Sequence, residues 1–152
     1  MTETDRIIDQ LNRAFVKHCW HGASVLETLD GLTAAQASNR PIQNAHPIWE
    51  LVLHLADWKD AVRKRVLGNI VELTDAEDWP PVAESTDAAW TAALKGLKAS
   101  HTKLIKTVTE FSTKQLHKPL PGRHSSPYFQ IMGSLQHDAY HAAQIMILRK
   151  LL

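Results

Sequence analysis

Gln136-His-Asp-Ala-Tyr-His-Ala-Ala-Gln144, near the carboxyl end of the chain, is the stretch from which both the fold and a site can be predicted. Its two histidines, His137 and His141, are four residues apart. On an α-helix, residues at this spacing point to the same side, with Cβ atoms about 5–6 Å apart. Two imidazoles placed in this way can reach one divalent metal ion at the usual zinc–nitrogen distance of about 2.0–2.1 Å. The alternative is a pair of histidines that lines a polar groove without metal.

The residues around this pair favour the wall of a polar cavity over a dry core. Gly133 and Ser134 come one turn before the pair, and Gln144 comes one turn after it. A helix face made of such residues leaves room for a substrate beside a metal. The stretch also resembles the His-Glu-x-x-His helix of zinc proteases, but Asp138, with a shorter side chain, replaces the general-base glutamate. We therefore do not expect protease chemistry, and we expect Asp138 to be solvated or structural.

A third histidine, His54, lies in a second helical run, Trp49-Glu-Leu-Val-Leu-His-Leu-Ala-Asp-Trp58. Its neighbours on the helix are mostly apolar, and a lone histidine on such a face is more often a hydrogen-bonded core residue than a ligand. If His54 joined the pair, three protein ligands would leave an open coordination position, as in catalytic metal sites. Spacing along the chain does not decide between these readings. Glu50, one turn earlier, is a candidate catalytic residue that could orient a ring or handle a proton.

Four long helical stretches predict an all-α, single-domain four-helix bundle over residues 1–152, with short extra helical turns and two longer connections. Capping residues, prolines and glycines bound the stretches at residues 3–19, 47–67, 86–111 and 127–152, with extra turns at 23–29 and 31–36. Ser85 or Thr86 is expected to cap the third stretch. Residues 70–73 are the one candidate strand, and this run is short.

Composition excludes several classes of protein. Lysine and arginine total 17 and aspartate and glutamate total 16, so a net charge of +1 gives no electrostatic argument for nucleic acid or membrane partners. Cys19 is the sole cysteine, which excludes an intramolecular disulfide or a zinc ribbon. No apolar run approaches the ~20 residues of a membrane span, and the polar N-terminus is unlike a signal peptide. We expect a cytoplasmic location.

Six of the nine histidines lie outside the three already considered. His21, at the break in the first helical stretch, is a second candidate catalytic residue that could reach toward a pocket. His46 is expected to be a loop or cap residue, and the other four are expected to be solvated: His18, His101, His117 and His124. The five tryptophans are expected to pack in the core. The basic run Arg63-Lys64-Arg65 is expected to be a solvated helix face.

Three blocks of the sequence carry a resemblance to a known family: residues 20–37, His46-Pro-Ile-Trp-Glu-Leu-Val-Leu-His-Leu-Ala-Asp-Trp58 and Gln136-His-Asp-Ala-Tyr-His-Ala-Ala-Gln-Ile145. They resemble the DinB-like superfamily of small four-helix bundle metalloproteins. The resemblance implies that His54, His137 and His141 bind one divalent metal. Zinc, nickel, iron and manganese all remain open, since imidazole accepts each of them.

The resemblance also implies a function, because members of that superfamily include thiol-dependent transferases and isomerases. On this basis we expect a metal-dependent thiol S-transferase or related detoxification enzyme with a small-molecule substrate. A low-molecular-weight thiol would be its second cofactor. The alternatives are a non-catalytic metal-binding or stress-response protein and a metal-dependent hydrolase. Dimers are frequent in the superfamily, so a homodimer is a further expectation.

Overall fold

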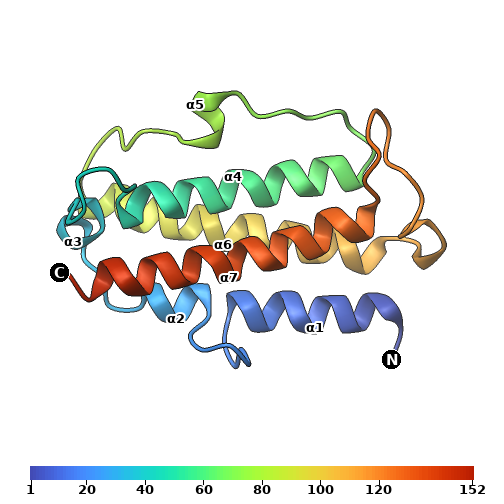
Figure 1. The fold of residues 1–152 in the computed structure, drawn as a ribbon, viewed down its shortest axis with the longest axis horizontal. Coiled ribbons are helices and arrows are strands. Elements are labelled where there is room, and N and C mark those ends of the chain that lie inside the picture. Colours follow the sequence, from blue (N-terminus) through green and yellow to red (C-terminus); the bar gives the residue numbers. More distant parts are fainter.

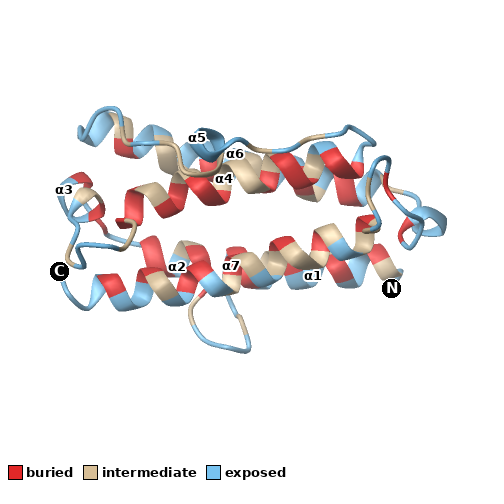
Figure 2. Ribbon diagram, turned by 45° about the horizontal axis from the view of Figure 1, so that its top comes forward, coloured by how far each residue is buried: buried red, intermediate tan, exposed pale blue.

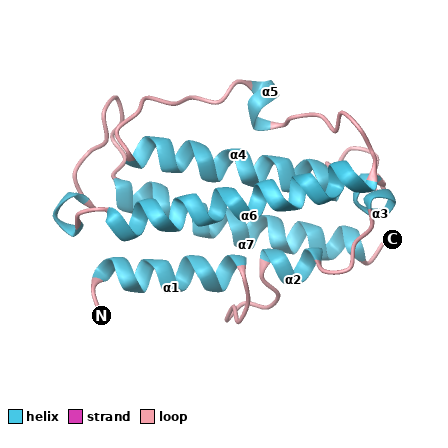
Figure 3. Cartoon of the chain, turned by 180° about the vertical axis from the view of Figure 1, so that it is seen from behind, coloured by secondary structure: helices cyan, strands magenta, loops and turns pink.

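Helices and loops make up the entire chain in the computed structural model, which describes residues 1–152 (Figure 3). Four helices are long: α1 (Glu3–Phe15), α4 (Ile48–Val66), α6 (Asp87–Glu110) and α7 (Pro127–Arg149). The short elements are α2 (Val25–Leu29), α3 (Ala34–Ser38), α5 (Asp75–Asp78) and a 3-10 turn at Thr113–Gln115. The predicted all-α four-helix bundle is confirmed. No helix combines the length and the apolar content that crossing a membrane requires.

The four long helices lie side by side, with α1 and α4 at opposite corners of the bundle (Figure 1). α4 packs against α6 and α7, and α1 packs against the same two helices. α2 lies end to end with α1, so the two together form one edge of the bundle. The long connection that carries α5 runs along the outside of α4, on the opposite side from the loop between α1 and α2 (Figures 1 and 3).

Hydroxyl side chains determine where most of these helices begin. Thr2, Ser24, Thr33, Thr74, Thr86 and Ser126 each stand at an N-cap and accept a hydrogen bond from the backbone N–H three residues later. Each bond satisfies one of the amides that a helix start leaves unpaired and contributes about 1 kcal/mol. The cap of α6 is therefore Thr86 and not Ser85.

One sequence-based boundary is wrong, and the one short candidate strand does not form. The first helix ends at Phe15 and not near Cys19, because His18 has φ of 66°, a left-handed value at which an α-helix cannot continue. The Cys19 thiol turns back and donates to the carbonyl of Arg13 at 2.8 Å. Residues 70–73 form no strand, since the carbonyl of Val71 accepts hydrogen bonds from two arginine side chains and not from a neighbouring strand.

The core consists of two apolar clusters separated by a layer of polar side chains. The larger cluster includes Phe15, Trp49, Leu51, Trp90 and Ile145, and the smaller includes Leu11, Val62, Leu104 and Ile131. Buried residues face inward along all the long helices (Figure 2). Between the two clusters each long helix contributes a polar residue: Asn12, Lys59, His101 and Asp138.

An ion pair and a histidine make up this polar layer. Lys59 Nζ lies 2.6 Å from Asp138 Oδ2, and both side chains are 1% exposed. Of the two roles expected for Asp138, solvated or structural, the buried ion pair shows the structural one. Burial raises the pKa of the Asp138 carboxyl, and the Lys59 ammonium opposes that rise. His101 is also buried, contrary to expectation: its ring stacks on Phe15 at 4.0 Å, and its Nε2 lies 3.0 Å from Asn12 Oδ1.

His101 predicts a loss of stability in mild acid. Burial lowers its pKa from 6.5 to about 3, and its Nδ1 has no partner that could stabilise a proton. The pKa of His101 is lower in the folded state than in the unfolded state. Its neutral ring therefore contributes fully to stability above pH 6.5, and this contribution is lost as pH falls toward 3. Between pH 7 and pH 4.5, the free energy of unfolding measured in urea should fall by about 2–3 kcal/mol more in wild type than in His101→Phe. Equal losses in the two proteins would contradict the assignment.

Candidate metal centre

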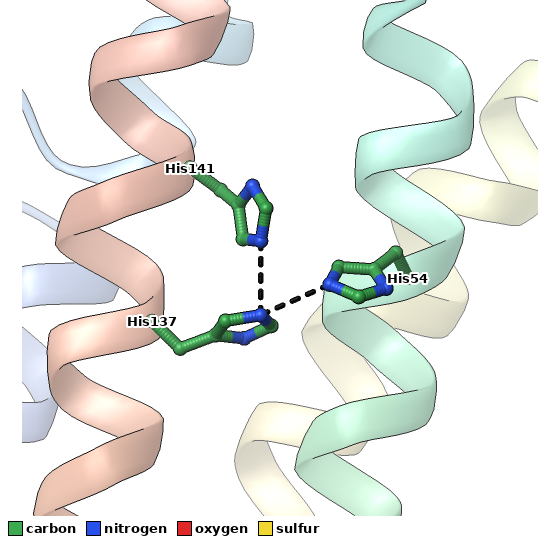
Figure 4. Close-up of side chains that lie close together, drawn as sticks. All are labelled: His54, His137 and His141. Carbon is green, nitrogen blue, oxygen red and sulfur yellow. Dashed lines mark hydrogen bonds between the residues drawn. The ribbon is translucent and has the colours of Figure 1, made fainter. Parts of the chain in front are cut away.

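Three imidazoles from two facing helices converge on one point. His54 projects from α4, and His137 and His141 project from α7 (Figure 4). The Nε2 atom of His137 lies 3.0 Å from that of His54 and 2.9 Å from that of His141. The three ligand atoms lie within 4.8 Å of one another. Ligands of a tetrahedral zinc ion lie about 3.3 Å apart at the usual bond length, so small ring movements would allow all three to bind one ion.

The outer contacts of two rings orient their Nε2 lone pairs toward this point. His54 Nδ1 lies 2.6 Å from the backbone carbonyl of Asp78, and His141 Nδ1 lies 2.6 Å from Gln144 Oε1. Both oxygens accept hydrogen bonds, so each Nδ1 carries the proton and each Nε2 is an acceptor. His137 can carry only one hydrogen on Nε2, and this hydrogen cannot bond fully to the Nε2 lone pairs of both His54 and His141. A cation among the three nitrogens would satisfy every lone pair, so the donor set fits a metal.

Electrostatics keeps these imidazoles neutral, the form that binds metal. Burial, assisted by the neighbouring imidazoles, lowers the pKa of His137 to about 3. Burial also lowers the pKa of His141 to about 4, while the hydrogen bond to Gln144 opposes the change. The pKa of His54 is lowered by burial as well. Protons therefore compete weakly for the three nitrogens at neutral pH.

The connection between α4 and α6 supplies two residues of the site that the sequence did not indicate. Asp78 orients His54 through its carbonyl, and its carboxylate Oδ1 lies 3.1 Å from the same Nδ1. The indole of Trp79 stacks on His54 with ring centres 3.8 Å apart and on His46 at 3.6 Å. Trp79 is therefore held between two imidazoles. The only signal was the turn-rich Asp78-Trp-Pro-Pro81, which indicates a loop but not its destination.

Two cavities flank the three histidines and share Trp79, Tyr140 and His141 as a common wall. The first, of about 570 Å³, extends along α4 and α7 and is bordered by all three histidines. Gly133 and Ser134 line it. The second, of about 480 Å³, lies on the other side of the wall, where Gln144 and His46 border it. The face that carries the three histidines thus opens onto space for a small molecule.

The two candidate catalytic residues have different locations. Glu50 is half-buried, and its carboxylate contacts two side-chain nitrogens: His46 Nδ1 at 2.6 Å and Arg40 Nη2 at 2.8 Å. Glu50 thus contacts the second cavity through His46. His21 is exposed in the loop between α1 and α2, on the opposite side of the bundle from α5, and it borders neither cavity. The structure does not bring His21 to the three histidines.

The structure corrects two expectations about which residues are exposed and which are buried. Arg65 is 4% exposed and not part of a solvated face: it donates to the Val71 carbonyl and to Gln130. Trp20 is 98% exposed, so not every tryptophan packs in the core. Trp49 and Trp90 are buried as expected, whereas Trp58 is half-buried and borders the first cavity.

Comparisons with known proteins agree with this architecture. A family model described as the DinB superfamily matches residues 19–145. A crystal structure described as the conserved protein of a locus from Enterococcus faecalis superposes with a TM-score of 0.68 at 16% sequence identity. The match covers 99% of this chain and 97% of that one, and at this identity it shows the shared fold alone. A search of curated proteins gave no match.

Proposed function

Because this chain belongs to the DinB superfamily, we propose that it binds one divalent metal ion through His54, His137 and His141 and acts as a metal-dependent thiol S-transferase or related detoxification enzyme. The observation that carries the proposal is the convergence of three neutral imidazoles at the wall of a cavity. Three protein ligands leave a coordination position for substrate. A divalent ion there would favour the thiolate form of a bound thiol.

The residues around the site support binding of a small organic molecule. Trp58, Val62 and Phe129 provide apolar walls along the first cavity, and such walls exclude water from a reacting thiol. Trp79 stacks on His54 and limits the directions from which a substrate can approach. The role of these residues is binding, orientation and exclusion of water.

Glu50 and His46 provide the proton acceptor in this proposal. A carboxylate can only accept, so the contact of 2.6 Å places the imidazole proton on His46 Nδ1. Nε2 of His46 is then free to accept a proton at the second cavity, on the other side of Trp79 from His54. The arrangement matches a general base oriented by a third group.

The experiment is a conjugation assay with a generic electrophile, a panel of low-molecular-weight thiols and protein loaded separately with Zn²⁺, Ni²⁺, Fe²⁺ or Mn²⁺. We expect turnover that needs both thiol and metal and that His137→Ala abolishes. His124→Ala, an exposed histidine that borders neither cavity, is the matched control. Turnover of ester or amide substrates without thiol would instead identify a hydrolase. Metal binding without turnover by any thiol would identify a non-catalytic metal-binding protein.

A further inference from the structure

Arg65 occupies the end of the first cavity farthest from the three histidines. His54, Trp58, Val62 and Arg65 recur at helical spacing along one face of α4, and all four border the cavity. At a rise of 1.5 Å per residue, the backbones of His54 and Arg65 are about 16 Å apart along the helix. The Arg65 side chain folds back over Trp58, with its guanidinium carbon 5.1 Å from the indole centre. The same indole contacts His54 and His137.

At the Arg65 end of the cavity, two arginine side chains have only one carboxylate to balance their positive charge. Arg65 and Arg123 both donate to the carbonyl of Val71, and both pair with one carboxylate, that of Glu72. The Glu72 side chain is 73% exposed, so water screens its charge, and it lies 3.6 Å from Arg65. Nε of Arg123 is buried without a partner. Two guanidinium groups therefore share one solvated carboxylate at this end of the cavity.

The other charged group that borders the cavity is already engaged. The Asp78 carboxylate accepts from the indole N–H of Trp58 and lies beside His54 Nδ1, at the metal end. Gln130 accepts from Arg65 Nη1 and Glu72 Oε2 lies 3.6 Å from Nη2, so these contacts fix the guanidinium and leave a second N–H on each Nη without a hydrogen bond. A fixed guanidinium with free N–H groups matches the planar, bidentate geometry of a carboxylate.

We propose that the substrate of this site carries a carboxylate that binds Arg65, joined by an apolar linker to the group that faces the three histidines. The linker lies against Trp58, Val62 and Phe129. The inference rests on the proposed function, because it takes the histidines as the metal end of the cavity. It adds that the cavity selects small anionic molecules through Arg65.

The test compares ω-mercaptocarboxylates of increasing chain length with the ω-mercaptoalkanols of equal length, which are neutral. Binding to the Co²⁺-loaded protein is followed through the Co²⁺–thiolate absorption band. At the chain length that spans the cavity, the carboxylate should bind about 10- to 100-fold more tightly than the alcohol. Arg65→Gln should remove this preference and Arg65→Lys should restore part of it. Arg63→Gln, on the same helix but paired with Asp60 outside the cavity, should retain it.

The outcomes separate the two proposals. Equal binding of acid and alcohol to the wild-type protein would overturn the carboxylate assignment alone, and this comparison does not depend on whether Arg65→Gln folds. A preference that survives in folded Arg65→Gln would also overturn it, because another group would then bind the carboxylate. Absence of the thiolate band with every ligand would overturn the proposed function and the inference with it.

Discussion

Asp138→Ala is expected to destabilise the protein by about 3–5 kcal/mol, because it leaves the Lys59 ammonium buried without a counter-ion. Lys59 Nζ lies 2.6 Å from Asp138 Oδ2 and is 1% exposed. Its other close contact is the face of Phe15, with the ring centre 4.7 Å away. A cation on an aromatic face gains far less than a buried ion pair. The free energy of unfolding, from urea titration at pH 7, measures the effect.

A double variant separates the cost of an unpaired charge from the net value of the pair. Lys59→Met with Asp138→Leu removes both charges and keeps similar volumes, so its stability should lie close to that of wild type or above it. Asp138→Asn, which keeps the shape but not the charge, should resemble Asp138→Ala. If the free energy of unfolding of Asp138→Ala lies within about 1 kcal/mol of the wild-type value, the Lys59 charge is not buried in the core as we describe.

The helices could be predicted from sequence because their signals are local. Thr33, Thr86 and Ser126 stand directly before helical runs, and the apolar spacing of each run indicates its buried face. The end of α1 could not be predicted, since the left-handed backbone of His18 has no specific sequence signal. Residues 70–73, the one short candidate strand, form no strand, in agreement with the all-α prediction, and arginine side chains occupy the Val71 carbonyl.

The residues of the site also differ in whether a local sequence signal could predict them. His137 and His141 are on one helix, so their spacing alone places them together, whereas His54 joined them only through the family resemblance. Asp78 and Trp79 lie on a connection whose path over α4 depends on tertiary packing. The Lys59–Asp138 pair contradicts the ordinary expectation that charged residues are solvated. Neither residue has a local signal of burial, because each needs the other across the helix interface.

His54→Ala is expected to weaken Zn²⁺ binding by more than about 100-fold, since loss of an outer partner of a ligand already costs 10- to 100-fold. The three histidines come from α4 and α7, so an ion bound by them would also link the two helices. In wild type, metal at 100 times its Kd should stabilise the fold by about 2.7 kcal/mol and raise Tm by about 5–10 °C. Thermal melts with and without Zn²⁺ and metal analysis of dialysed protein measure both effects.

Graded variants distinguish a true ligand from a neighbour. His137→Ala and His141→Ala should lose the Tm rise as His54→Ala does, because two imidazoles cannot hold the ion against dialysis. Gln144→Leu removes only the hydrogen bond that orients His141, so it should weaken binding by about 10- to 100-fold and keep a reduced rise. His124→Ala, an exposed histidine outside the site, should match wild type. One ion per chain retained by His54→Ala would remove His54 from the metal site and leave the α7 pair without its partner.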